Sequence, residues 1–226
     1  MRKVLIIHTT THDPKVSSSW TLGWATASAI QRVVPADVRV IDANKLHIVQ
    51  NLSCYASGGR NCADPKAGPY RCWAHHDSAA NPRKWGGVDE MPVIYEGLKW
   101  ADTVIFATST RWGSHSALLQ KIIERMNTLE NRGSVWNEKF PMEGKRLGVI
   151  VAGLNWKSVN TAQHLLETFR WWKFDVDPEA ALVWQYTRDL NYEQTGDLKP
   201  NVQAWLQTPE GISALNRFAL TLLGGK

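Results

Sequence analysis

The chain has 226 residues, 43% of them hydrophobic, which predicts one domain with a substantial core. No apolar run approaches the roughly 18 residues that span a membrane, so a membrane protein is not expected. The formal charge is +5, but Lys and Arg are scattered and form no basic run or helix face, which argues against nucleic acid as a partner.

The amino-terminal stretch MRKVLIIHTT predicts a core strand rather than a secretion signal. Its apolar run is short, Val4–Ile7, and no small-residue cleavage site follows it. The three cysteines do not suggest a disulfide framework. We therefore expect a cytoplasmic protein.

The first strand, Lys3–Ile7, is followed by a loop rich in hydroxyl groups and then by a helix. The loop covers residues 8–20, and the helix is predicted from about Ser19 to Val33. The serines at 17–19 are good N-cap residues, so backbone N–H groups at this helix end could bind an anion such as a phosphate. An ordinary connecting loop with capping serines fits the segment equally well. It contains neither GxGxxG nor GxxxxGK[ST], which excludes a dinucleotide fingerprint and a P-loop here.

A long irregular segment follows the second predicted strand, Asp37–Ile41. It runs from Asp42 to Gly87 and contains all three cysteines. A loop of this length inside a compact domain is usually functional, so we expect it to cover a ligand or to form a subunit contact. A helix is predicted from Val88, with Asp89 as its N-cap.

The stretch Thr103–Met126 indicates a ligand site. It begins with the apolar run Val104–Ala107, which suits a strand buried on both faces. A loop of small and polar residues follows at 108–114, and an amphipathic helix then begins. A buried strand that opens into such a loop and a helix places a site at the carboxyl edge of a parallel sheet.

The remaining chain repeats this alternation of strand and helix. Five predicted strands alternating with helices imply a parallel sheet covered on both faces. We expect one domain over residues 1–226, with an insertion at about 44–87. The later elements are strands at Lys145–Ala152 and Ala181–Tyr186, a helix at about Val159–Lys173, and a helix in Asn201–Leu223 that can break near Pro209.

Two segments resemble a known family. Asp89–Arg125, with its loop TSTRWGS, and Gly144–Phe169 are similar to the flavodoxin-like NAD(P)H-dependent FMN reductases and their iron–sulfur flavoprotein relatives. The resemblance implies an α/β, flavodoxin-like, doubly wound sheet of five parallel strands in the order 2-1-3-4-5. It also implies FMN as cofactor, bound at the carboxyl edge, with NAD(P)H as hydride donor.

The resemblance assigns cofactor contacts to three loops. In the first loop, His8-Thr9-Thr10 stands where the family has Gly-Ser-Pro, and in the second, Ser109 replaces a proline. These departures leave the individual contacts open. The residues implied to bind the cofactor are Thr9, Thr10, Ser17, Ser18 and Ser19 in the first loop, Thr108, Ser109, Thr110, Arg111, Trp112, Gly113 and Ser114 in the second, and Gly153 and Asn155 in the third.

The function implied is an FMN-dependent NAD(P)H oxidoreductase. It would reduce a small acceptor (a quinone, a nitroaromatic or a flavin) by ping-pong hydride transfer, and no side chain must act as acid or base because the flavin carries the reaction. The alternatives are a flavodoxin-like protein that shuttles electrons between protein partners, and a flavodoxin-like protein that has lost FMN. A homodimer or homotetramer is expected, and the choice between NADH and NADPH stays open.

The cysteines of the insertion do not form a metal motif. Cys54, Cys62 and Cys72 lack a CxxC spacing, and an iron–sulfur cluster usually needs four thiolates. His75 or His76 could complete a zinc site of three cysteines and one histidine, or reach the substrate pocket. We expect no metal, with the three thiols free.

Overall fold

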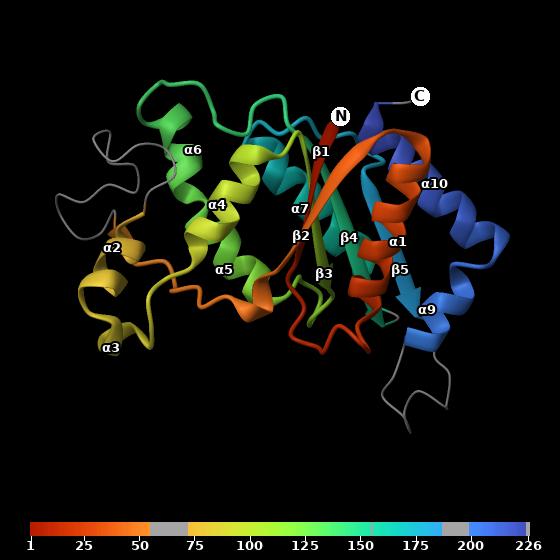
Figure 1. Ribbon diagram of the computed structural model, residues 1–226, viewed down its shortest axis with the longest axis horizontal. Coiled ribbons are helices and arrows are strands. Elements are labelled where there is room, and N and C mark those ends of the chain that lie inside the picture. The colour runs from red at the N-terminus through yellow and green to blue at the C-terminus, as the bar shows by residue number, and fades with distance from the viewer. Residues whose placement is uncertain (55–71, 155, 187–198, 225–226) are drawn as a thin grey trace.

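The computed structural model describes residues 1–54, 72–154, 156–186 and 199–224 of the chain. Five parallel strands form one sheet in the order β2-β1-β3-β4-β5, which confirms the predicted flavodoxin-like topology (Figure 1). The strands are β1 (Arg2–His8), β2 (Ala36–Asp42), β3 (Thr103–Ser109), β4 (Arg146–Leu154) and β5 (Ala181–Tyr186).

Helices cover both faces of this sheet. Figure 1 shows α1 beside α9 and α10 on one face, and α4, α5 and α7 on the other. The helices are α1 (Ser18–Val33), α2 (Trp73–Ala80), α3 (Pro82–Trp85), α4 (Met91–Trp100), α5 (Ala117–Arg125), α6 (Asn127–Ser134), α7 (Ser158–Trp171), α9 (Lys199–Trp205) and α10 (Pro209–Leu223), and η1 (Ala43–Lys45) is a 3-10 turn. The predicted break near Pro209 is confirmed by the separation of α9 from α10.

The core lies on the two central strands. Val4–Ile7 of β1 and Val104–Ala107 of β3 are fully buried, because helices cover both of their faces. Ile6 pairs with Ile105 across the two strands. Phe106 stacks on Phe169 of α7 with 4.6 Å between ring centroids, which fixes that helix against the sheet.

The sequence suggested that the insertion is irregular throughout, and the structure corrects this. Within its described part it contains η1, α2 and α3. The side chain of Asn81 caps α3 by accepting from Lys84 N, and Pro82 occupies the first helical position. These helices are too short for their apolar residues to show a helical period, so the sequence pattern missed them. The segment 55–71, which includes Cys62, lies outside the described residues.

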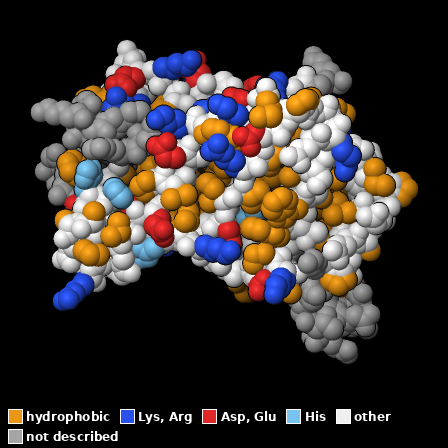
Figure 2. All heavy atoms as spheres, viewed as in Figure 1, with side chains coloured by type: hydrophobic (Ala, Val, Ile, Leu, Met, Phe, Trp, Pro, Cys, Tyr) orange, Lys and Arg blue, Asp and Glu red, His pale blue; other side chains and the backbone are white. Residues whose placement is uncertain are grey.

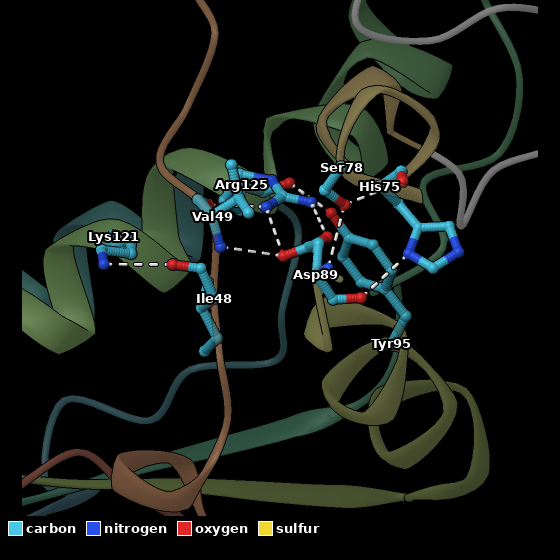
Figure 3. Close-up of polar contacts among 8 residues, drawn as sticks. All are labelled: Ile48, Val49, His75, Ser78, Asp89, Tyr95, Lys121 and Arg125. Carbon is cyan, nitrogen blue, oxygen red and sulfur yellow. Dashed lines mark hydrogen bonds and ion pairs between the residues drawn. The ribbon is translucent and has the colours of Figure 1, made fainter. Parts of the chain in front are cut away.

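Asp89 is not a helix N-cap, contrary to the prediction. Helix α4 begins at Met91, and its N-cap Glu90 makes no side-chain capping bond. The Asp89 carboxylate is instead buried and forms a bidentate pair with Arg125 of α5, at 2.9 and 2.6 Å. The same carboxylate accepts from Val49 N, and Arg125 Nη1 donates to Val49 O, as Figure 3 shows. The pair therefore ties the first part of the insertion, at Val49, to α5.

Histidine and tyrosine side chains complete this network. Ser78 Oγ accepts from Asp89 N, and His75 Nδ1 lies 2.9 Å from Asp89 O, so it must donate to that carbonyl (Figure 3). Tyr95 OH donates to Arg125 O, and burial raises the pKa of Tyr95 well above its usual value, which keeps it a donor. His75 therefore serves the fold of the insertion.

The loops at the carboxyl ends of the strands meet at one edge of the sheet. The loop between β1 and α1 lies at the lower edge in Figure 1, opposite the two chain termini. Within the described ranges, no helix is long and apolar enough to cross a membrane.

Candidate functional site

A cavity of about 260 Å³ opens at the carboxyl edge of the sheet. Three loops line it: the one from β1 to α1, the one from β3 to α5, and the one from β4 to α7, and β5 adds a wall residue, Trp184. A switch point of strand order in a parallel sheet is the usual place for a ligand in such folds. The lining brings together Thr10, Ser17, Ser18, Ser19, Ser109, Thr110, Arg111, Trp112 and Gly153 of the residues predicted from sequence.

One end of the cavity is the amino terminus of α1. Ser17 is the N-cap, and its side chain accepts from Trp20 N at 3.2 Å. The backbone N–H groups of Ser18 and Ser19 belong to the first turn, where no carbonyl of the helix can accept from them. The first turn carries no acidic side chain. This end of the cavity therefore suits an anion such as a phosphate.

The floor of the cavity offers a polar atom that a ligand can satisfy. Ser109 Oγ is buried and has no hydrogen-bond partner among the described residues. Beside it, Thr110 donates its Oγ1 proton to Ser158 Oγ at 3.0 Å. A Cβ on Gly153 would collide with both of these hydroxyl groups, so glycine leaves room for the loops to approach closely.

The loop after β3 forms a tight turn at the rim. Arg111 and Ser114 exchange backbone hydrogen bonds of 2.7 and 2.9 Å, and Trp112 and Gly113 between them have φ values of +48° and +78°. Trp112 is 95% exposed although it lines the cavity. The indole therefore stands at the mouth of the site.

Arg111 bridges two of the loops. Its Nη2 lies 2.7 Å from His12 Nε2, and both residues line the cavity. Because a guanidinium has no acceptor, His12 Nε2 must accept, and the proton of the neutral ring is then on Nδ1.

Other predicted residues lie next to the cavity without lining it. Thr9 donates its Oγ1 proton to Ala107 O, and Thr108 Oγ1 accepts from Ser116 N, so both hydroxyls join the ends of β1, β3 and α5. Gly113 and Ser114 belong to the rim turn. Asn155 lies outside the described residues.

Sequence reasoning missed five lining residues, namely His12, Val16, Ala152, Trp156 and Trp184. His12 and Val16 stand in the hydroxyl-rich loop, where only the serines and threonines carried the signal of an anion site. Trp156 directly follows the third predicted loop. Trp184 is 5% exposed and carries the pattern of an ordinary core residue, so no local signal could have identified it.

The described residues contain no cluster of three His, Cys, Asp or Glu side chains that could hold a metal. Cys54 and Cys72 are buried and form no disulfide.

The chain resembles flavin enzymes of known structure. RosB, solved with the bound intermediate 8-demethyl-8-formylriboflavin-5'-phosphate, has a TM-score of 0.64 at 16% identity, covering 99% of this chain and 81% of that one. The apo form of the NADH:FMN oxidoreductase EmoB has a TM-score of 0.55 at 14% identity, covering 98% and 90%. An FMN-dependent NADH-azoreductase from Bacillus anthracis, in complex with FMN, has a TM-score of 0.55 at 14% identity, covering 97% and 100%. At these identities the likeness shows the shared fold.

Sequence comparison gives the family. No curated protein matches the chain significantly. The NADPH-dependent FMN reductase family matches over residues 2–188, from β1 past the end of β5. This match spans all five strands and the three loops of the cavity. The chain is therefore an enzyme of the NADPH-dependent FMN reductase family.

Proposed function

We propose that the chain binds FMN in this cavity and uses NAD(P)H to reduce a small acceptor such as a quinone, a nitroaromatic or a flavin. The observation that carries the proposal is the polarity of the cavity. Its lining includes a helix amino terminus with three serines and no acid in the first turn, and the indoles of Trp112, Trp156 and Trp184. A phosphate joined to a flat ring system has the matching shape and charge.

The residues present fit that cofactor. Thr10 and Ser17–Ser19 would hold the phosphate by hydroxyl and backbone N–H groups. Ser109 would satisfy its buried hydroxyl on the ring system, and Gly153 would permit close backbone approach. When bound, FMN supplies hydride acceptance and release, and the protein supplies orientation and electrostatics.

Donor and acceptor would enter at the exposed side of the cavity, where Trp112 stands. Arg111 and His12 come from two different loops, line the cavity and contact one another. Nicotinamide and acceptor would then use the same entrance in turn, which predicts ping-pong kinetics with parallel lines in double-reciprocal plots. No cavity-lining residue in the described ranges is acidic, which favours anionic partners such as NAD(P)H.

The spectrum of the purified protein tests the proposal. We expect flavin absorbance after incubation with FMN and gel filtration, loss of that absorbance on addition of NADPH, and its return with a quinone. A folded protein that takes up no FMN would refute the proposal. FMN uptake with reoxidation only by a redox protein would favour electron transfer between proteins instead. Parallel titrations with NADH and NADPH decide the donor.

We also propose that the enzyme is a homo-oligomer. Figure 2 shows hydrophobic side chains gathered near β2 and α1. On β2, an edge strand, Val38 and Val40 are only partly buried, and on α1 Trp24 is 49% exposed. Contiguous apolar surface of this kind commonly marks an interface. Sedimentation velocity at several protein concentrations measures the state, and a monomer throughout would overturn this proposal.

A further inference from the structure

The backbone of Trp112 has a strained conformation that its own surroundings do not explain. Its φ of +48° is a left-handed value that a bulky side chain rarely adopts. A turn of this kind, with positive φ at both central residues, ordinarily carries Asn-Gly or Gly-Gly. Because the side chain is 95% exposed, burial does not offset the strain. Strain of this kind gathers at ligand-binding sites.

The turn packs against a second strained residue that carries a charge. A Cβ on Gly113 would lie 3.0 Å from Lys157 Cδ and 3.4 Å from Trp156 Cη2. Lys157 itself has a φ of +57°, and its Nζ lies 5.0 Å from the centroid of the Trp156 ring. Trp156 is 51% exposed. Two open indoles and one ammonium therefore share one rim of the cavity.

We propose that Trp112, Trp156 and Lys157 form the acceptor subsite, and that it selects flat polycyclic acceptors bearing an acidic group. An exposed indole face gains most from stacking on an extended ring system. The ammonium of Lys157, with the guanidinium of Arg111 on the same loop as Trp112, favours an anionic substituent. This inference rests on the proposed function, since it names the class of its acceptor.

The reaction at this subsite is a two-electron reduction. A quinone gains a hydride, whose electron pair comes from NAD(P)H, together with a proton from water, and leaves as the hydroquinone. The subsite residues bind and orient the acceptor and exchange no proton with it. They determine specificity and are not catalytic residues.

Binding of redox-inert probes tests the subsite without turnover. We expect naphthalene-2-sulfonate to bind the FMN-loaded protein in calorimetry, with Kd raised at least ten-fold by Trp112→Gly and at least five-fold by Lys157→Gln. The neutral 2-naphthol should lose affinity in Trp112→Gly but not in Lys157→Gln. Trp112→Phe keeps a stacking ring and should retain most of the affinity. Trp171→Ala removes an indole that is 72% exposed outside the cavity and should change neither Kd.

Acceptor kinetics provide the second readout. For Trp112→Gly, kcat/KM for 1,4-naphthoquinone-2-sulfonate should fall at least ten-fold relative to hexacyanoferrate(III), which is not planar. For Lys157→Gln, the kcat/KM for the sulfonated naphthoquinone should fall relative to the kcat/KM for the neutral naphthoquinone. Trp112→Gly should melt no lower than the wild type, because glycine relieves the left-handed strain.

Each outcome bears on one proposal. Failure of the wild type to bind either naphthalene probe, Kd values for Trp112→Gly within two-fold of the wild type, or an equal loss in Trp171→Ala would overturn the subsite. Absence of NAD(P)H oxidation by the FMN-loaded wild type would overturn the proposed function, while the calorimetry would still decide the subsite.

Discussion

His8 is a buried ring at the end of β1 whose two nitrogens find no hydrogen-bond partner among the described residues. It packs under α1, with its ring centroid 4.2 Å from that of Trp20, and a Cβ on Gly23 would lie 2.5 Å from its Cε1. Burial lowers the pKa of His8 to about 3. The ring is therefore neutral in the folded protein at any pH well above 3.

This histidine should make the protein sensitive to acid. Unfolded, the ring titrates near 6.5, so between pH 6.5 and about 3 the unfolded chain binds a proton that the folded chain does not. Stability from this group is complete above pH 6.5 and declines as pH falls, by at most about 1.4 kcal/mol per pH unit. In urea titrations from pH 7 to 4, His8→Phe should lose stability less steeply than the wild type. The exposed His76→Phe is the control, and equal slopes for wild type and His8→Phe would contradict the argument.

The Asp89–Arg125 pair is the opposite case: the buried carboxylate and both Nη atoms of Arg125 have partners, and Nε of Arg125 lacks one among the described residues. Breaking such a pair leaves one charge buried without compensation, so Asp89→Asn and Arg125→Met should each lower the free energy of unfolding by about 3–5 kcal/mol. The double variant should lose less than the sum, because the second change removes the orphaned charge. Chemical denaturation measures all three.

A second ion pair supplies the control for this prediction. Arg146 and Asp175 approach to 3.7 Å with side chains 30% and 58% exposed, and solvent screens them. Asp175→Asn should therefore cost about 0–1 kcal/mol. Equal losses in Asp89→Asn and Asp175→Asn would show that the buried network does not hold the insertion.

At the scale of the element, a comparison of two helix N-caps distinguishes an effect on stability from an effect on FMN binding. Ser17 caps α1 at the cavity, and Thr208 caps α10, where its Oγ1 accepts from Gly211 N at 3.1 Å. Loss of either cap should cost about 1 kcal/mol of stability. Only Ser17→Ala should also weaken FMN binding, because its hydroxyl and the adjacent N–H groups line the cavity.

Fluorescence titration of FMN into Ser17→Ala and Thr208→Ala measures the difference. We expect an increase in Kd of several-fold for the first and none for the second. Equal effects on Kd would mean that Ser17 acts only through the stability of α1, and that the phosphate binds elsewhere.

The elements that the sequence predicted well are those with a strong apolar signal. Buried parallel strands such as Val104–Ala107 read as short apolar runs, and Ala181–Tyr186 is confirmed at both ends. Helix α6 was missed because Met126 ends α5 as its C-cap, and the chain then bends into residues of low hydrophobicity. Asp89 was misassigned because an acidic residue before a helix looks the same in sequence whether it caps the helix or pairs with a distant arginine.

At the scale of the whole molecule, the sequence could predict only those site residues that belong to a local sequence pattern. Serines at a helix start and a polar loop after a buried strand carry their own signal, and the cavity brings most of them together. Trp184 and the bridge from Arg111 to His12 depend on the order of β1, β3 and β5 across the sheet, and no local pattern encodes that order.

Because the cavity joins three loops and β5, bound FMN should stabilise the molecule as a whole. A ligand that binds only the folded state at 100 times its Kd adds about 2.7 kcal/mol, which for a chain of this size raises Tm by roughly 5–11 °C. Thermal unfolding with and without FMN measures the shift. Riboflavin, which lacks the phosphate, should give a much smaller shift at the same concentration, since it leaves the amino terminus of α1 without its anion.

The same measurement on variants locates the ligand. Asp89 belongs to the network around α5 and the insertion and does not line the cavity. Asp89→Asn should therefore lower Tm with and without FMN, and the rise in Tm caused by FMN should stay the same as in the wild type. Ser17→Ala should instead reduce the shift, because the affinity itself falls. If FMN and riboflavin raised Tm equally, the phosphate would contribute nothing, and a flavin bound through the indoles alone would have to replace the arrangement proposed for α1.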